Sequence, residues 1–160
     1  MDAIFLDIKD IKGDSDIKGF EKQIEVLSFS HGVAAQVTGD VSNEQRTSGK
    51  PMHQDFSLTK YADTSSPLLN QKCCEGANLG DVTVTIGRND KGVILVLYTY
   101  IMKDVILSSV SIGGGGGGKP VESLTLNYSR IEWHYTSQKQ EGGKEGEIVG
   151  KWDLSKNVAA

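Results

Sequence analysis

The residues whose types and spacing come nearest to a metal site lie close to the start of the chain. Four of them stand at the spacing of an EF-hand calcium loop, which needs carboxylates around a turn glycine: Asp14, Asp16, Gly19 and Glu25. Lys18, however, puts a cation where the loop needs a ligand, and the flanking residues alternate like strands instead of forming helices. We therefore interpret this segment as a charged turn between two strands.

A phosphate-binding loop is the second candidate. The run GGGGGGKP matches the GxxxxGK pattern as far as Lys119. Pro120 then supplies no hydroxyl for Mg²⁺, and a strand pattern follows where the loop needs a helix N-terminus. We interpret Gly113 to Gly118 as a long, flexible turn between two strands.

Histidine and cysteine are the other residue types that could do chemistry. His31, His53 and His134 are far apart in the sequence and stand in no zinc-ligand spacing or nucleophile motif. Cys73 and Cys74 are neighbours, a poor geometry for a disulfide with each other, and the chain has no third cysteine. A triad assembled across the fold stays open. The sequence marks no catalytic, metal-binding or cofactor-binding residue, and we expect a protein that is not an enzyme.

The composition is that of an ordinary globular chain. A length of 160 residues, with 38% hydrophobic and 24% charged residues, predicts a single domain over 1–160. A net charge of −4 argues against nucleic acid as a partner, because phosphate binding needs clustered Lys and Arg. The longest apolar run, Val93 to Ile101, is shorter than the roughly 20 residues of a membrane-spanning helix. Asp2 and Asp7 stand where a signal peptide is basic, so we expect no signal peptide.

Strand patterns recur along most of the chain. β-Branched and aromatic residues bounded by turn residues predict strands near residues 2–9, 20–31, 52–61, 80–88, 92–103, 104–112, 121–137 and 147–157. The turn at Asn89 to Gly92 predicts an antiparallel hairpin. One short helix is predicted between an N-cap at Ser66, with Pro67 in the first position, and Gly76. Its buried face is expected to contain Leu68, Leu69 and Cys73.

Two predicted strands change the parity of their apolar residues partway along. Ile24 and Val26 are followed by Leu27 and Phe29, and the strand from 121 to 137 shows the same change after Tyr128. Because side chains alternate between faces, each shift indicates a bulge or burial on both faces. Both suit a curved, closed, antiparallel sheet.

An apolar surface that the predicted elements leave uncovered indicates self-assembly. The run from Val93 to Ile101 is apolar on both faces, and one short helix cannot cover it. A second sheet or a neighbouring subunit is expected to do so. The segment 36–51 holds only Val37 and Val41 as apolar residues and exceeds the usual loop length, so we interpret it as an extended functional loop.

Four blocks of sequence together resemble the haemolysin-coregulated protein family. The blocks are FSLTKYADTSSPLL (56–69), VILSSVSIGG (105–114), ESLTLNYSRIEWHYTSQ (122–138) and KWDLSKNVAA (151–160). The resemblance covers nearly the whole chain. It implies an all-β fold, a small β-barrel of two antiparallel sheets with one short flanking α-helix. It also implies a hexameric ring, and stacked rings that form the inner tube of the bacterial type VI secretion system.

The resemblance also implies partners and a location. The family's tube is propelled by a contractile sheath, is tipped by the valine-glycine-repeat spike protein and carries small effector proteins in its lumen. It assembles in the bacterial cytoplasm and leaves through the apparatus without a signal peptide. By the same comparison, Ser28 and Ser30 are expected to face the lumen. The inter-ring contact is expected in the extended loop, at Val41, Ser42, Asn43, Glu44, Gln45, Arg46, Thr47 and Ser48. The subunit interface is expected to include Tyr98, Tyr100, Trp133 and Tyr135.

Two other classes of function stay open. One is a monomeric β-sandwich module that binds carbohydrate or peptide, and the other is a cryptic enzyme. The run from Val93 to Ile101 argues against a monomer, because a monomer would expose this apolar surface to water.

Overall fold

The computed structural model describes residues 2–37, 39, 49–138 and 144–160. Its elements in chain order are β1 (Asp2–Ile8), β2 (Ile24–Val26), β3 (Ser28–Ser30), β4 (Val33–Ala34), β5 (Met52–His53), β6 (Phe56–Tyr61), α1 (Ser66–Glu75), β7 (Val82–Asp90), β8 (Val93–Lys103), β9 (Ile106–Gly113), β10 (Val121–Asn127), β11 (Arg130–Gln138) and β12 (Lys144–Asp153).

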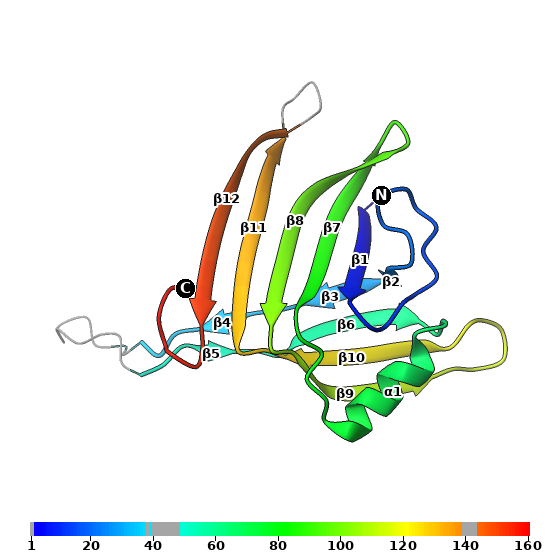
Figure 1. The fold of residues 1–160 in the computed structure, drawn as a ribbon, viewed down its shortest axis with the longest axis horizontal. Helices are drawn as coiled ribbons and strands as arrows, with labels where there is room; N and C mark the ends of the chain where they lie inside the picture. The colour runs from blue at the N-terminus through cyan, green and yellow to red at the C-terminus, as the bar shows by residue number, and fades with distance from the viewer. Residues whose placement is uncertain (1, 38, 40–48, 139–143) are drawn as a thin grey trace.

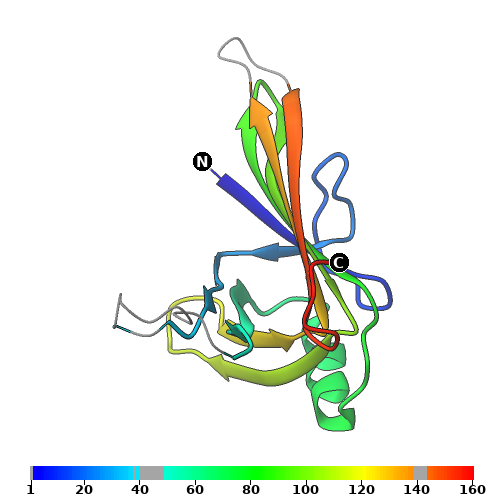
Figure 2. The ribbon, with the colours of Figure 1, turned by 90° about the vertical axis from the view of Figure 1, so that its left-hand side faces the viewer.

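Two antiparallel sheets and a short ribbon contain all of these strands. A six-stranded sheet has the order β12-β11-β8-β7-β1-β2, and a four-stranded sheet has the order β3-β6-β10-β9. The ribbon pairs β4 with β5. The strands of the two sheets cross at a steep angle, and the six-stranded sheet extends well beyond the other (Figures 1 and 2). The all-β, antiparallel class is therefore confirmed.

The expected closed barrel is wrong, and the parity shifts explain why. Between Val26 and Ser28 the chain leaves β1 and begins to pair with β6, so the predicted strand 20–31 is two strands in different sheets. The predicted strand 121–137 is likewise β10 in one sheet and β11 in the other. Each shift marks a change of sheet at a corner, and in the described residues both sheets end in unpaired edges.

The hairpin between β7 and β8 agrees with the prediction. Its loop is the pair Lys91 and Gly92, with φ of 54° and 84°, the left-handed geometry of a tight two-residue hairpin turn. The run Gly113 to Gly118 also connects two strands, β9 and β10, as expected.

The helix begins one residue earlier than predicted, and its buried face contains one residue fewer than predicted. Its N-cap is Ser65 and it begins at Ser66, while Gly76 ends it with φ of 62° as predicted. Leu69 is fully buried and Cys73 packs against the core, with its Sγ 3.7 Å from the Leu107 carbonyl. Leu68 lies 41% exposed, so the expectation that it belongs to the buried face is wrong. The helix lies beside β9 (Figure 2) and packs on the core through Leu69 and Cys73.

A buried ion pair ties the four-stranded sheet to the start of the helix. Lys60 and Glu122 are cross-strand neighbours, both with side chains 0% exposed, and Lys60 Nζ lies 2.8 Å from Glu122 Oε2. The same ammonium group donates to Asp63 Oδ1 at 3.0 Å and to the Tyr61 carbonyl at 3.1 Å. Three partners thus satisfy a charge that burial would otherwise make costly.

We predict that Glu122→Ala lowers the free energy of unfolding by about 3–5 kcal/mol, because it leaves the Lys60 charge buried without its main partner. The double variant Lys60→Met with Glu122→Leu is expected to recover most of that loss, since it removes both charges. Urea denaturation at neutral pH measures both. A Glu122→Ala loss below about 1 kcal/mol would contradict the account.

Candidate functional site

Two complete rows of hydroxyl side chains cross one face of the four-stranded sheet. Strand register aligns them as Ser28, Thr59, Ser123 and Ser111 in one row and Ser30, Ser57, Thr125 and Ser109 in the next. None of these eight residues is buried. Because side chains alternate, the other face of the same strands carries core residues such as Phe56 and Leu124. We call the eight residues the hydroxyl face.

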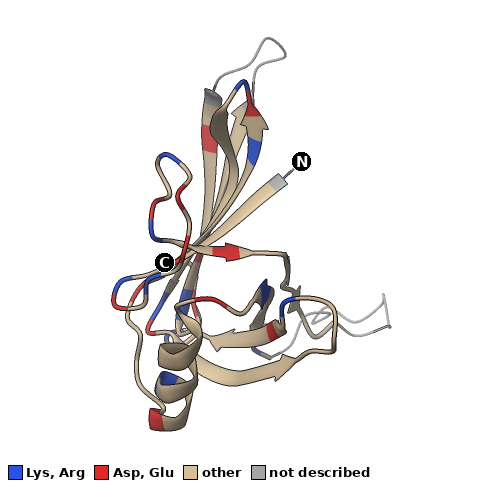
Figure 3. Cartoon of the chain, turned by 90° about the vertical axis from the view of Figure 1, so that its right-hand side faces the viewer, with Lys and Arg blue, Asp and Glu red and all other residues tan. Residues whose placement is uncertain are grey.

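Hydrogen bonds between neighbouring strands connect the hydroxyl face. Ser28 Oγ bonds Thr59 Oγ1, and Ser109 Oγ lies 2.6 Å from Thr125 Oγ1. The strand positions that flank the two rows on this face include Tyr61, Val121 and Asn127, which are uncharged. At one margin the Asp55 carboxylate accepts hydrogen bonds from Asn127 and from Ser108, whose hydroxyl also bonds Thr125 of the hydroxyl face. Figure 3 shows β9 without a charged residue along its length, whereas charges gather on the helix and on the β1–β2 segment. The eight residues of this surface are polar and uncharged, and one carboxylate lies at its margin.

The sequence found two of these eight residues. Ser28 and Ser30 are exposed on the edge strand β3, but the other six could be identified only from the register of β6, β9 and β10. Exposure of the two serines leaves their expected lumen position a prediction.

A row of apolar side chains crosses one face of the six-stranded sheet. Register aligns it from β2 to β12 as Val26, Ile4, Ile86, Tyr98, Tyr135 and Ile148. Exposure is low at Val26 and Ile86, both 8%, and highest at the other end of the row, where Tyr135 is 46% and Ile148 68% exposed. The β11–β12 end of this apolar row, as we call it, lies on the part of the sheet that extends beyond the four-stranded sheet (Figure 1).

The four aromatic residues expected at the subunit interface lie side by side. Tyr100 is opposite Trp133, and Tyr98 is opposite Tyr135. Tyr100 and Trp133 pack against the core, with the Tyr100 ring 4.9 Å from that of Phe56, and burial raises the pKa of Tyr100 to about 12. Tyr98 and Tyr135 continue the same face outward, so only this second pair lies in the exposed part of the row.

The opposite face of the six-stranded sheet is charged around His134. Its Nε2 lies 3.0 Å from Glu132 Oε1, its Nδ1 bonds Glu147, and Lys151 Nζ lies 3.7 Å from Glu132. Burial alone lowers the pKa of His134, but the hydrogen bonds to Glu147 and Glu132 outweigh it, so the pKa is raised. Glu132 carries a lowered pKa, mainly through its bond to His134.

The other two histidines meet at a corner between the sheets. His31 Nε2 and His53 Nδ1 both bond the hydroxyl of Tyr128, the latter at 3.0 Å. Burial lowers the pKa of both rings, and it raises the pKa of Tyr128. Sequence reasoning missed this cluster because the three residues are separated by strands and by the extended loop.

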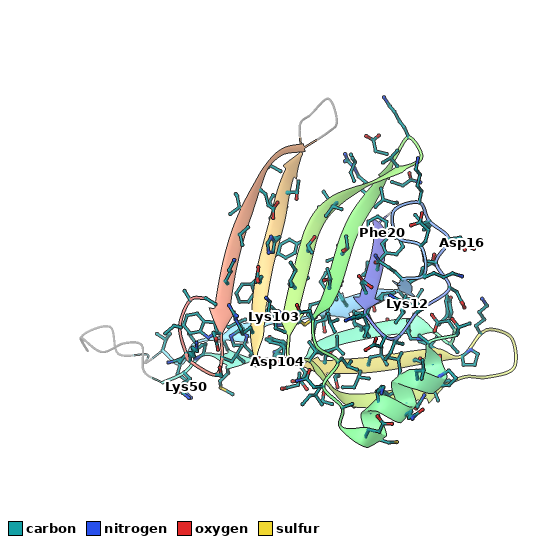
Figure 4. All side chains as sticks on the ribbon, in the orientation of Figure 1. Lys12, Asp16, Phe20, Lys50, Lys103 and Asp104 are labelled. Atoms are coloured by element: carbon teal, nitrogen blue, oxygen red, sulfur yellow. The ribbon has the colours of Figure 1, made fainter. Side chains whose placement is uncertain are left out.

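The residues at the EF-hand spacing are not brought together as a calcium loop. Asp14 accepts a 2.7 Å hydrogen bond from Thr64, Asp16 is exposed at the margin of the molecule (Figure 4), and Glu25 lies within β2. Phe20, also in this segment, stacks on Phe5 of β1 at 4.4 Å, which fixes the segment as a structural turn. Within the described ranges no three His, Cys, Asp or Glu residues cluster as a metal site would, and no helix has the length and apolarity to cross a membrane.

The segment 36–51, which the sequence predicts as an extended loop, connects β4 to β5. The expected inter-ring contacts from Val41 to Ser48 fall outside the described residues.

Comparisons with known proteins identify the family of this chain. A sequence model of the family described as "Type VI secretion system effector, Hcp" matches residues 5–135. The chain belongs to the Hcp family. It is 36% identical to "Protein hcp1" of Pseudomonas aeruginosa over 98% of both chains.

Solved structures with the same fold include other members of this family. One described as a type six secretion system protein matches with a TM-score of 0.93, at 26% identity over 100% of both chains. Hcp1 from Salmonella typhimurium matches with a TM-score of 0.81, at 24% identity over 99% of both chains. The resemblance inferred from the four sequence blocks is thus confirmed, and the chain is a member of a type VI secretion family.

We predict that the three histidines titrate in two groups, one above and one below pH 6.5. The ring of His134 is expected to titrate above the ordinary midpoint of 6.5, because two carboxylates stabilise its charged form. His31 and His53 are expected to titrate with midpoints below 6.5, because burial disfavours their charged forms. NMR titration of the ring protons measures all three, and a common midpoint would contradict the described environments.

Proposed function

We propose that this chain is the tube subunit of a type VI secretion system and works by assembling with copies of itself into hexameric rings that stack. The observation that carries the proposal is the division of its two sheets into one neutral, hydroxyl-lined face and one partly uncovered apolar row. A closed ring needs both kinds of surface, one toward the lumen and one toward the neighbouring subunit.

The apolar row is the proposed subunit interface. Tyr135 and Ile148 expose apolar area at one edge of the sheet, and Val93 at the tip of the β7–β8 hairpin is 61% exposed. Surfaces of this kind are buried in stable homo-oligomers, whose interfaces resemble a domain core more than a solvated surface. Tyr98 and Tyr135 are the members of the expected aromatic set that reach this area.

The hydroxyl face is the proposed lumen wall, including Ser28 and Ser30. Hydroxyl groups bond to water and to each other, and the eight residues of the face carry no fixed charge, while Asp55 lies at its margin. A cargo protein in contact with it would gain many weak hydrogen bonds and little hydrophobic or ionic attraction. Small effector proteins could thus be carried, protected and released.

The family supplies the remaining proposed partners. The spike protein at the tip and the contractile sheath around the tube are proposed from Hcp membership, and the inter-ring contact is proposed for the loop residues 41–48. We propose assembly in the bacterial cytoplasm and export through the apparatus. No catalytic step is part of the proposal.

Ile148 and Val149 offer a matched test of the interface. They are neighbours on β12, both apolar and exposed, and they point to opposite faces of the sheet. We predict that Ile148→Asp weakens ring assembly by roughly 100-fold, because it would bury an unpaired carboxylate at the interface. The particle mass measured by light scattering should fall to that of a monomer or small oligomer.

Val149→Asp is the control and should leave the particle mass unchanged, because Val149 lies on the face that already carries Glu147 and Lys151. Rings of unchanged mass for Ile148→Asp, or equal loss for both variants, would contradict the assigned interface.

We predict that deleting residues 41–50 leaves rings intact and stops them from stacking, because the loop is the proposed inter-ring contact. Negative-stain images of the purified variant would then contain single rings at concentrations where the unaltered protein forms tubes. Tubes of unchanged length would overturn the assignment of this loop.

A further inference from the structure

Two histidines stand on the two sides of the extended loop and converge on one hydroxyl. His31 lies between β3 and β4, just before the loop, and His53 lies on β5, just after it. Their ring centroids are 6.3 Å apart, and both rings bond the hydroxyl of Tyr128, which is 4% exposed. The same hydroxyl donates to the Gln54 carbonyl at 3.3 Å, so it is the point at which polar contacts attach the β4–β5 ribbon to the corner between β10 and β11.

Backbone contacts attach the ribbon only weakly. Its ladder is the two pairs Val33 with His53 and Ala34 with Met52, extended by the bond from Gln54 N to the Gly32 carbonyl at 2.9 Å. Val33 and Met52 are 48% and 62% exposed, so little apolar burial stabilises it. A two-stranded ribbon of this size is marginal on its own, and side-chain bonds at its base therefore matter.

The surroundings of the two rings are apolar and aromatic. His31 stacks on Phe56 at 5.5 Å and His53 stacks on Trp133 at 6.2 Å. Tyr100 also meets His31, at 5.9 Å. His53 additionally lines an open groove of ≈ 360 Å³ with Trp133 and Trp152, so one side of its ring faces solvent.

Among the residues that the structure describes, the charged and titratable groups around the pair give it no anionic partner. The groups that face each histidine are its partner histidine, Tyr128, Tyr100 and Asp55. The charge of Asp55 raises the pKa of Tyr128, and its carboxylate bonds Ser108 and Asn127. Among the described residues no carboxylate bonds either ring. When one ring takes up a proton, the tyrosine hydroxyl can still bond both rings. A second proton would place two charged rings around one oxygen in a partly buried site, which is unfavourable.

We propose that His31, His53 and Tyr128 form a proton-operated latch, which holds the β4–β5 ribbon against the corner at neutral pH and releases it on acidification. Both rings have a pKa below 6.5 when the ribbon is closed, and the open ribbon has ordinary histidines. The open state therefore binds more protons, so closure is strongest above pH 6.5 and weakens as the pH falls below it.

The latch deepens the proposed function, because the ribbon carries the loop proposed as the inter-ring contact. Acidification would then weaken stacking while leaving the subunit interface in place. This consequence rests on the proposed function, but the latch itself does not.

Hydrogen–deuterium exchange on the full-length protein tests the latch. The amides of residues 32–34 and 52–54 are compared at about pH 7.5 and about pH 5.5, with protection corrected for the intrinsic pH dependence of exchange. We expect protection of the Gln54 amide to fall at least about tenfold at the lower pH, while amides of β7 change little. This local readout gives the same answer for a monomer and for a ring, so failure of the latch and failure of the tube proposal are distinguishable.

The double variant His31→Gln with His53→Gln retains hydrogen-bonding groups but cannot take up protons, and it is expected to lose the pH dependence. If that variant does not fold, His53→Gln alone should reduce the pH slope of protection by about half, from two protons to one. His134→Gln is the matched control and should respond like the unaltered protein, because His134 lies on the far face with Glu132 and Glu147. Equal protection at both pH values, or an undiminished response in the histidine variants, would overturn the latch.

Discussion

The four-stranded sheet packs against only part of the six-stranded sheet, and the rest of the molecule depends on this partial overlap. Where the sheets meet, one cluster of buried side chains, including Leu6, Val84 and Leu126, forms the core. Beyond that overlap, β7, β8, β11 and β12 continue without a covering layer (Figure 2). The same strands therefore stabilise the subunit at one end and present apolar area at the other. In the proposed tube this area is where one subunit meets the next.

Partial overlap is possible because the chain changes sheets at sharp corners. Leu27 separates β2 from β3, and Tyr128 with Ser129 separates β10 from β11. Neither sheet has to curve round and close. The four-stranded sheet presents one face to solvent, whereas Phe20 covers Phe5 on the outer face of the six-stranded sheet. On the four-stranded sheet that face carries the two hydroxyl rows. At the second corner, the buried hydroxyl of Tyr128 becomes the point to which the β4–β5 ribbon is attached.

The sequence predicted features that depend on local pattern and missed those that depend on register between distant strands. Alternation predicted the strands, and the Lys91–Gly92 turn and the helix end at Gly76 follow from local backbone geometry. The parity shift after Val26 was detected, but a shift alone does not distinguish a bulge from a change of sheet. Thr125 joins the hydroxyl face only because of its partners Ser57 and Ser109, which are far away in the sequence. Burial of Lys60 likewise requires Glu122, a partner that no spacing rule identifies.

In the proposed assembly the hydroxyl face lines a channel and the apolar row lies between neighbouring subunits. A cryo-electron microscopy structure of the purified, assembled protein tests both parts in one measurement. The account predicts a six-fold ring in which Ser28, Thr59, Ser123 and Ser111 of each subunit face the channel, and in which Tyr135 and Ile148 contact the neighbouring subunit. A ring with the hydroxyl face on its outer surface, or with the apolar row facing solvent, would contradict it.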